Sequence, residues 1–219
     1  MQTKKSAAWI WLVSPTYKFA ERKKNELLLT DNGRAAVTKA IKSYNIYYFR
    51  ATIGLACLAH LFVLLQKHYP LIDYRYTNFS VWVVFGWMIF FSRGFEIAKA
   101  FLDDAVEKLN HEPSRSNLHY GDRLKLAFRS YIELMVGFGT LYYILPPGMM
   151  KEGFDNILHA IYFSGVTMTT IGYGDNSPTH FVTQILVVFQ VFCGLTLALV
   201  SFTVYTSLAL AHTQNNKEE

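Results

Sequence analysis

Apolar residues along the chain fall into four long runs separated by polar loops. The first, Ile46 to Gln66, has about the 20 residues that a helix needs to cross the hydrocarbon of a bilayer. The second, Phe79 to Ser92, is short, and we expect its helix to run on into a polar stretch that ends near 111–113. The third, Leu124 to Leu145, is stopped by Pro146-Pro147-Gly148. The fourth, Phe181 to Ala211, contains no charged residue. The pattern predicts an all-α membrane protein with four transmembrane helices.

A shorter apolar segment, Phe154 to Thr170, lies between the third and fourth runs. Its apolar residues follow helical spacing, but the segment is too short to cross a bilayer. Glycine-rich polar residues follow it directly. Non-helical backbone at membrane depth is tolerated only where it is buried in protein or lines an aqueous pathway. We therefore expect a re-entrant helix, followed by a backbone segment that lines a pathway for a polar species.

Composition supports the membrane assignment, since 52% of the 219 residues are hydrophobic and only 17% are charged. Soluble domains carry about 25% charged residues. The net charge of +5 does not indicate nucleic acid as a partner, because the basic residues flank apolar runs instead of forming a polar domain. The two cysteines, Cys57 and Cys193, lie inside apolar runs and are interpreted as small hydrophobic residues.

The distribution of lysine and arginine predicts the topology. Many basic residues precede the first run or lie between the second and third, whereas the opposite loops offer Lys67, Arg75 and Lys151. Basic residues concentrate on the cytoplasmic side. A multi-pass protein of the cell membrane is predicted, with both termini cytoplasmic and the re-entrant segment on the outer face.

The segment from Ala7 to Leu29 combines aromatic and basic residues, which favours a helix lying on the inner leaflet over an additional crossing.

The predicted organisation has four parts. They are a cytoplasmic segment with this interfacial helix (1–45), two accessory helices with a linker (46–123), a pore domain (124–212) and a short cytoplasmic tail (213–219).

The stretch Thr170-Ile171-Gly172-Tyr173-Gly174 has the chemistry of a cation pathway. Glycine permits backbone angles that let successive carbonyl oxygens point toward one axis. Rings of such oxygens can replace the hydration shell of a monovalent cation, and the Thr170 hydroxyl would add one more ring. The preceding helix directs its partially negative C-terminal end toward the same place, which also favours a cation.

At these residues, "TMTTIGYGD" resembles the signature of the pore-loop potassium channels, and the resemblance extends over about Leu124 to His212. It implies that Thr170 to Gly174 line a selectivity filter and that K⁺ binds at Thr170, Ile171, Gly172 and Tyr173. One pore segment per chain further implies a homotetramer around a central pore. Apart from the permeant K⁺, no cofactor is implied.

The resemblance also assigns supporting positions. Asp175 stands just outside the filter, where the family hydrogen-bonds it to aromatic residues of the pore helix, and Tyr162 and Phe163 occupy places that often hold tryptophans. Val166 stands where some bacterial members carry a glutamate, and Thr169 completes the supporting set. On the fourth run, Gly194 matches a hinge position, although glycine there also suits a close helix contact. Two residues near the expected constriction are gate candidates, Thr206 and Leu210.

Charged residues give few further indications of regulation. Arg129 and Glu133 lie four residues apart, so they share a helix face and could pair. Neither outer run holds the arginine ladder of a voltage sensor, so strong voltage gating is not expected. His159 and His180 lie toward the outer side, where an interfacial role is favoured over pH sensing.

The sequence thus favours a subunit of a potassium-selective channel that passes ions passively, and no nucleophile, metal or phosphate motif suggests an enzyme. Two alternatives remain. One is a non-selective monovalent cation channel. The other is a non-conducting membrane subunit that regulates a partner.

Overall fold

The computed structural model describes residues 13–68, 90–110 and 112–218. Most of the predicted second run, and Trp9 and Trp11 of the predicted interfacial helix, lie outside the described residues. In the described ranges the regular elements are helices, with one isolated antiparallel β-bridge between Met150 and Pro178. The elements are α2 (Pro15–Leu28), α3 (Gly33–His68), α6 (Ser92–Leu109), α7 (Tyr120–Tyr143), α8 (Ile157–Met168), α9 (Phe181–Leu195), the π-helix η2 (Thr196–Phe202) and α10 (Thr203–Glu218).

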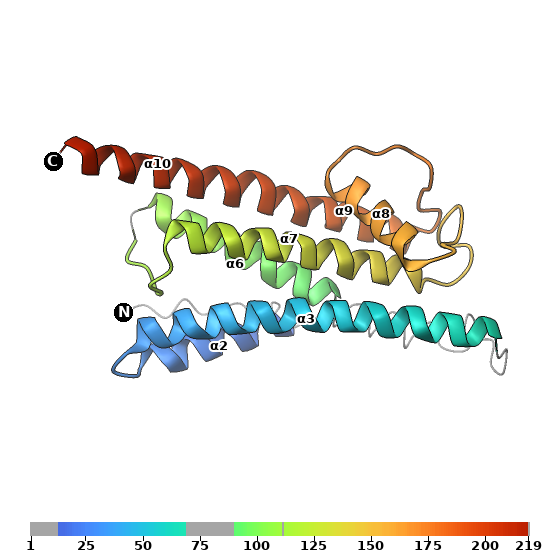
Figure 1. The fold of residues 1–219 in the computed structure, drawn as a ribbon, viewed down its shortest axis with the longest axis horizontal. Coiled ribbons are helices and arrows are strands. Elements are labelled where there is room, and N and C mark those ends of the chain that lie inside the picture. Colours follow the sequence, from blue (N-terminus) through green and yellow to red (C-terminus); the bar gives the residue numbers. More distant parts are fainter. Residues whose placement is uncertain (1–12, 69–89, 111, 219) are drawn as a thin grey trace.

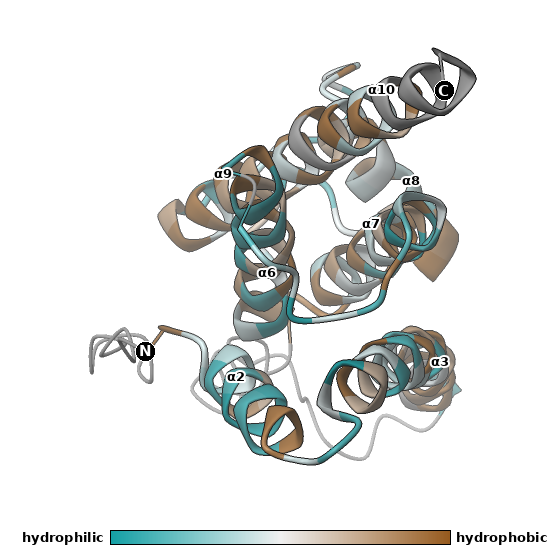
Figure 2. Ribbon diagram, turned by 90° about the vertical axis from the view of Figure 1, so that its left-hand side faces the viewer, coloured by the Kyte–Doolittle hydropathy of each residue, from teal (hydrophilic) through white to brown (hydrophobic). Residues whose placement is uncertain are grey.

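The long helices run roughly along one axis (Figure 1). The α2–α3 turn, the loop between α6 and α7 and the end of α10 lie at one end of that axis, and the loop after α8 lies at the other. Seen along the axis, α2 and α3 form one side, α9 to α10 the opposite side, and α6 and α7 lie between them (Figure 2). The loop after α8 is therefore far from the end that holds the predicted constriction.

Helix α3 starts earlier than the apolar run predicts. It begins at Gly33 instead of Ile46 and continues for 36 residues, about 54 Å at 1.5 Å per residue, which exceeds the roughly 30 Å of hydrocarbon. The sequence "RAAVTKAIKS" contains no helix breaker, so the helix continues although its polar residues fall outside the apolar run. The boundary predicted at residue 45 is therefore inside a helix.

Helix α2 packs against other helices. Its N-cap Ser14 accepts a hydrogen bond from Tyr17 N and also donates to the carbonyl of Ser92, 2.7 Å away on α6. The Thr16 and Ser92 hydroxyl oxygens lie 2.9 Å apart. Most of α2 is hydrophilic (Figure 2). The predicted interfacial helix thus corresponds in part to a polar helix docked on α6 and α3.

The predicted fourth run forms one continuous helical rod through α9, η2 and α10, and it extends through the predicted tail to Glu218. Two described helical stretches are long and apolar enough to cross a membrane, Gly33–Leu65 and Phe181–Leu210. The third predicted run corresponds to α7, which does not reach that apolarity because it carries Arg129 and Glu133. The polar stretch predicted to follow the second run is helical in α6, which ends at Leu109, whereas most of the run itself lies outside the described residues.

The core lies where α8 packs between α7 and α9. Large buried residues from the three helices meet there, among them Phe138, Tyr142, Phe163, Met168 and Cys193. The approach of α7 to α8 is close, since a Cβ on Gly139 would lie 2.7 Å from the Cα of Ile161. The core therefore fixes α8 and, with it, the segment that follows.

Candidate functional site

Helix α8 is the predicted re-entrant helix, and its bounds fall within the predicted segment. Asn156 caps its start, because the Asn156 side chain accepts a hydrogen bond from His159 N at 3.0 Å. Ala160 and Ser164 on one face are fully buried, whereas Leu158 and Tyr162 are exposed. A 12-residue helix is about 18 Å long, which is too short to span the roughly 30 Å of hydrocarbon.

The residues after α8 remain attached to its last turn. The backbone N–H groups of Thr169, Thr170 and Ile171 donate to the carbonyls of Gly165, Thr167 and Val166, at 2.9, 3.0 and 3.1 Å. The Thr169 hydroxyl donates to Gly165 O at 2.7 Å. These bonds satisfy carbonyls that a helix end otherwise leaves unpaired. Thr169 and Val166 therefore position the start of the predicted filter.

The backbone of the predicted filter alternates in handedness. Thr170 has φ 60°, Gly172 has φ 60° and Gly174 has φ 76°, and among described non-glycine residues only Thr170 has positive φ. In a regular strand successive peptide groups point to opposite sides. Reversing the sign of φ at every second residue allows successive carbonyls to point to the same side. Glycine adopts this conformation without strain, whereas threonine is held there against its preference.

The predicted filter is exposed in the single chain. All residues from Thr169 to Asp175 are exposed, with Ile171 and Tyr173 at 55% and 66%. Tyr173 stacks nearly parallel on Tyr162, with ring centroids 6.4 Å apart and an interplanar angle of 8°. A polar backbone stretch at this depth is tolerated only beside other protein or water. The exposed side of the predicted filter is therefore expected to face other protein or water.

The aromatic support differs from the family pattern. Phe163 is buried and makes edge contacts with Tyr142, with ring centroids 5.1 Å apart, so it belongs to the core behind the filter. Within the described part of the chain, no hydrogen bond joins Tyr162 to Asp175. Tyr162 supports the filter through its stacking on Tyr173. The hydrogen bond that the resemblance implies at Asp175 is therefore not made to Tyr162 within the described part of the single chain.

A buried hydrogen-bond network behind α8 has no counterpart in the sequence prediction. The Tyr142 hydroxyl donates to Gln190 Oε1 at 2.7 Å, and Gln190 Nε2 donates to Ser164 O and Oγ at 2.9 and 2.7 Å. Ser164 in turn donates to the carbonyl of Met135 at 2.7 Å. Gln190 and Ser164 are fully buried, and Tyr142 is 1% exposed. The network joins α7, α8 and α9 directly behind the filter.

The outer end of the filter is held by Asn176. Its side-chain oxygen accepts from Glu152 N at 3.2 Å, and its amide donates to Glu152 O at 2.9 Å. Lys151 N donates to Ser177 O at 2.8 Å. At the start of α9, the Thr183 hydroxyl donates to Met149 O at 2.7 Å. The segment after the filter is therefore fixed to the loop that precedes α8.

The predicted gate residues lie away from the filter. Gly194 lies against α8, since a Cβ there would be 2.6 Å from Met168 Cγ, so the close-contact interpretation describes its packing. Thr206 and Leu210 are exposed on α10.

His180 caps α9, with Nδ1 accepting from Val182 N at 3.3 Å, and His159 is exposed on α8.

The pairing that helical spacing allows between Arg129 and Glu133 is not formed. Glu133 is 2% exposed and accepts from Arg93 Nε at 2.8 Å, whereas Arg129 donates to Asn45 on α3 at 3.1 Å. Arg93 also pairs with Glu96 at 2.7 Å. Packing of α6 and α3 on either side of α7 separates the two charges, because each meets a closer partner on a neighbouring helix.

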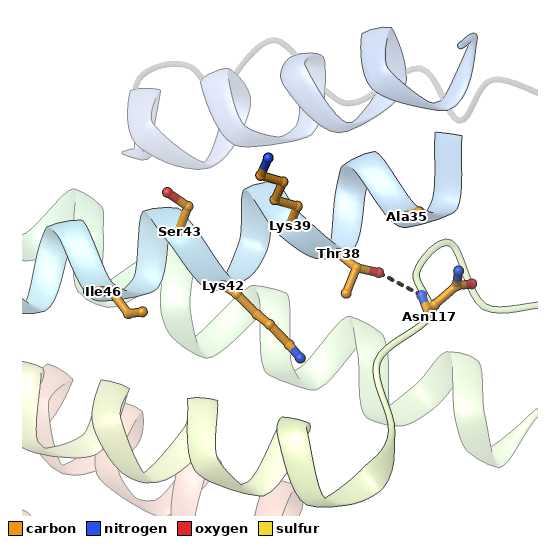
Figure 3. A pocket seen from close by; sticks show the side chains of 7 residues that line it. All are labelled: Ala35, Thr38, Lys39, Lys42, Ser43, Ile46 and Asn117. Carbon is orange, nitrogen blue, oxygen red and sulfur yellow. Dashed lines mark hydrogen bonds between the residues drawn. The ribbon is translucent and has the colours of Figure 1, made fainter. Parts of the chain in front are cut away.

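A cavity of about 570 Å³ that is widely open to solvent lies elsewhere, between the polar part of α3 and the loop before α7. In it, the Thr38 hydroxyl accepts from Asn117 N at 2.8 Å, and Lys39 and Lys42 leave α3 in opposite directions (Figure 3). Lys42 pairs with Asp122 at 2.9 Å. No predicted site residue lines this cavity. Among the described residues no group of three His, Cys, Asp or Glu side chains could hold a metal ion.

Comparison with known proteins identifies the same region. A family model described as an ion channel matches residues 130–210, which include most of α7, all of α8, the filter and α9. The chain is also similar to a protein of Oryza sativa subsp. japonica named two pore potassium channel a, with 38% identity over 65 residues. That similarity covers 30% of this chain and 18% of the relative, so the chain matches less than a fifth of the relative's length. No solved structure gives a significant match. The similarities support an ion channel in a membrane, with residues 130–210 as its channel segment.

Proposed function

We propose that the chain is one subunit of a potassium-selective channel, in which Thr170 to Gly174 form the filter and four copies surround the pore. The observation that carries the proposal is the alternation in the sign of φ, which is positive at Thr170, Gly172 and Gly174. This segment is hydrogen-bonded to the last turn of α8 and is exposed in the single chain. Carbonyl rings assembled from several such segments suit dehydrated K⁺. Ions would pass down their gradient, with no chemical step.

The apolar face of α9 and η2 supports assembly with further copies. Its large exposed residues recur at alternating spacings of four and three, which is the spacing by which helices pack along a seam. They are Phe181, Ile185, Val188, Phe192, Leu195 and Leu199. Because this face begins at Phe181, shortly after the predicted filter in the sequence, copies of the chain meeting there would bring their filter segments together.

The name of the rice relative, a potassium channel, favours potassium over a non-selective cation pathway. The intact filter segment disfavours a non-conducting regulatory subunit, since such a subunit needs no alternating backbone. The basic residues flanking α3 and α6 support a multi-pass protein with both termini cytoplasmic.

The test is current from purified protein in planar bilayers under opposed potassium and sodium gradients, together with native mass spectrometry of the oligomer. A reversal potential near the potassium equilibrium value, from a four-chain assembly, is the expected result. Gly172→Asp should abolish the current, because an L side chain at φ 60° is strained and a carboxylate enters the filter.

Gly153→Asp is the matched control. Gly153 lies in the outer loop, a Cβ added to it would have no neighbour within 4 Å, and its φ is not positive. The same substitution there should leave the reversal potential unchanged. A reversal potential near zero with real conductance would replace the proposal by the non-selective channel. Absence of current across voltages, pH values and lipid mixtures would favour the regulatory subunit.

A further inference from the structure

Arg123 is a buried charge at the end of the molecule opposite the filter. It is 2% exposed although it stands in the first turn of α7, and its guanidinium forms an ion pair with Asp104 of α6. It also donates to Leu118 O at 3.2 Å and to Ser114 Oγ at 3.1 Å in the preceding loop. A buried arginine is tolerated only when its donors are satisfied in this way, so the position is built for a specific set of partners.

Tyr205 brings the inner helix, which is formed by α9, η2 and α10, into the same cluster. Its side chain is 1% exposed, and its hydroxyl donates to Asp104 Oδ2 at 2.6 Å. The guanidinium carbon of Arg123 lies 5.9 Å from the centre of the Tyr205 ring. One carboxylate oxygen of Asp104 thus pairs with α7 and the other accepts from α10, so a single side chain bridges three helices.

The cluster lies on the C-terminal side of the π-helix η2, which interrupts the α-helical course of the inner helix. The π-helix η2 separates α9 from α10, and such segments are rare, less stable than α-helix and frequent at functional sites. Above it, Gln190 and Gly194 fix α9 to the back of the filter. Below it, Tyr205 is buried on α10, and its neighbour Thr206 is exposed. The two halves of the inner helix therefore have separate anchors.

We propose that Asp104, Arg123 and Tyr205 form a latch that holds the lower half of the inner helix against α6 and α7, away from the pore axis, and so couples the peripheral helices to pore opening. The proposal rests on the proposed function. In the proposed four-chain pore the pathway would run along the face of α10 that is exposed in the single chain. Release of the latch lets α10 move toward the axis, with η2 absorbing the change, and narrows the pathway at Thr206 and Leu210.

Tyr205→Phe tests the latch with the smallest change, because it removes the hydroxyl and keeps the ring. Loss of a hydrogen bond to a carboxylate should shift the closed–open equilibrium about tenfold toward closed. Single-channel conductance and reversal potential should stay as in the wild type, since the filter is untouched. Asp104→Asn should act in the same direction.

Asp103→Asn is the matched control. Asp103 is the neighbouring carboxylate on α6, but it faces α2, where it accepts from Tyr17 at 3.0 Å and pairs with Lys99 at 2.9 Å. It should leave the open probability unchanged. In the double variant, Tyr205→Phe should add less to Asp104→Asn than it does alone, because Asp104→Asn already removes the charged acceptor of the Tyr205 hydroxyl.

Hydrogen–deuterium exchange of residues 203–210 supplies a readout that needs no current. Exchange should increase in Tyr205→Phe and Asp104→Asn and stay unchanged in Asp103→Asn. Wild-type open probability and exchange in both latch variants would overturn the latch, as would additive shifts in the double variant or a shift toward open. A non-selective wild type would contradict the proposed function while leaving the latch measurable.

Discussion

Gly194 of the inner helix lies so close to Met168 at the end of α8 that a Cβ on Gly194 would come within 2.6 Å of Met168 Cγ and 3.0 Å of its carbonyl oxygen. The contact joins the residue before the filter turn to the helix behind it. Any side chain at position 194 must move either the end of α8 or α9 itself.

Gly194→Ala should therefore lower the stability of the protein by about 1–3 kcal/mol through overpacking. Thermal unfolding in detergent measures this change. Gly54→Ala is the control, because Gly54 is also helical but has no atom within 4 Å of its Cβ position, and the substitution should be neutral or slightly stabilising. Equal unfolding temperatures for the two variants would contradict the contact.

Gln190→Leu should weaken both the fold and the selectivity of the filter. The substitution leaves the Tyr142 hydroxyl and both acceptor groups of Ser164 without this partner, and each unsatisfied buried group costs about 1–3 kcal/mol. We expect a lower unfolding temperature and a reversal potential shifted toward zero in a potassium–sodium gradient.

Gln184→Leu makes the same chemical change on α9, at an exposed position. It should leave both measurements close to wild type. If Gln190→Leu behaves like Gln184→Leu, the network contributes nothing to holding the filter.

Arg93→Met should destabilise the protein more than Glu133→Gln does. Arg93 compensates two buried carboxylates, Glu96 and Glu133, and its guanidinium lies 4.1 Å from the centre of the Tyr48 ring. Removing it leaves both carboxylates buried without their cation, at a cost of about 3–5 kcal/mol. Glu133→Gln keeps an acceptor for Arg93 and leaves Arg93 paired with Glu96.

Arg129→Met is the control for that series, because Arg129 donates to a neutral amide on Asn45 and so leaves no buried charge behind when removed. Thermal unfolding of the three variants should rank Arg93→Met lowest. An Arg129→Met variant that is as unstable as Arg93→Met would show that loss of any positive charge on these helices has the same effect.

Cysteine labelling tests the proposed topology. In a Cys57→Ser background, which removes an exposed thiol, Gly153→Cys should react with a membrane-impermeant maleimide added outside intact cells. Asn117→Cys, in the loop before α7, should react only after the cells are permeabilised. The reverse pattern would invert the orientation predicted from the basic residues.

Much of the helical arrangement follows from the length of apolar runs. Positions of α7, α8 and the inner helix are close to those predicted, because a run of about 20 apolar residues and a short run before glycine have few alternatives in a membrane. The start of α3 lies well before its apolar run, since apolarity marks where a helix meets lipid and not where it begins. The π-helix η2 lies in an apolar run with no sequence signal of its own.

The partners of single polar residues could not be predicted. Gln190 is one amide in a long apolar run, and its role emerges only when α7 and α8 bring Tyr142 and Ser164 to it. Helical spacing allows an ion pair between Arg129 and Glu133, but such a pair four residues apart stabilises a helix by only about 0.2–0.5 kcal/mol. Glu133 pairs instead with Arg93 on α6. The positive φ at Thr170 likewise depends on hydrogen bonds to α8 that no local pattern contains.

The uninterrupted course of α3 makes it a rigid rod between two environments. One end reaches the turn that leads to α2, and the other reaches His68. A residue inserted in its polar portion would turn everything before it by about 100° and displace it by about 1.5 Å. Ser14 and Thr16 would then face away from Ser92. Inserting a whole number of helical turns would instead restore the orientation of α2 and displace it along the axis of α3. The docking of α2 therefore depends on the rotational phase of a helix that also carries an apolar stretch long enough to cross a membrane.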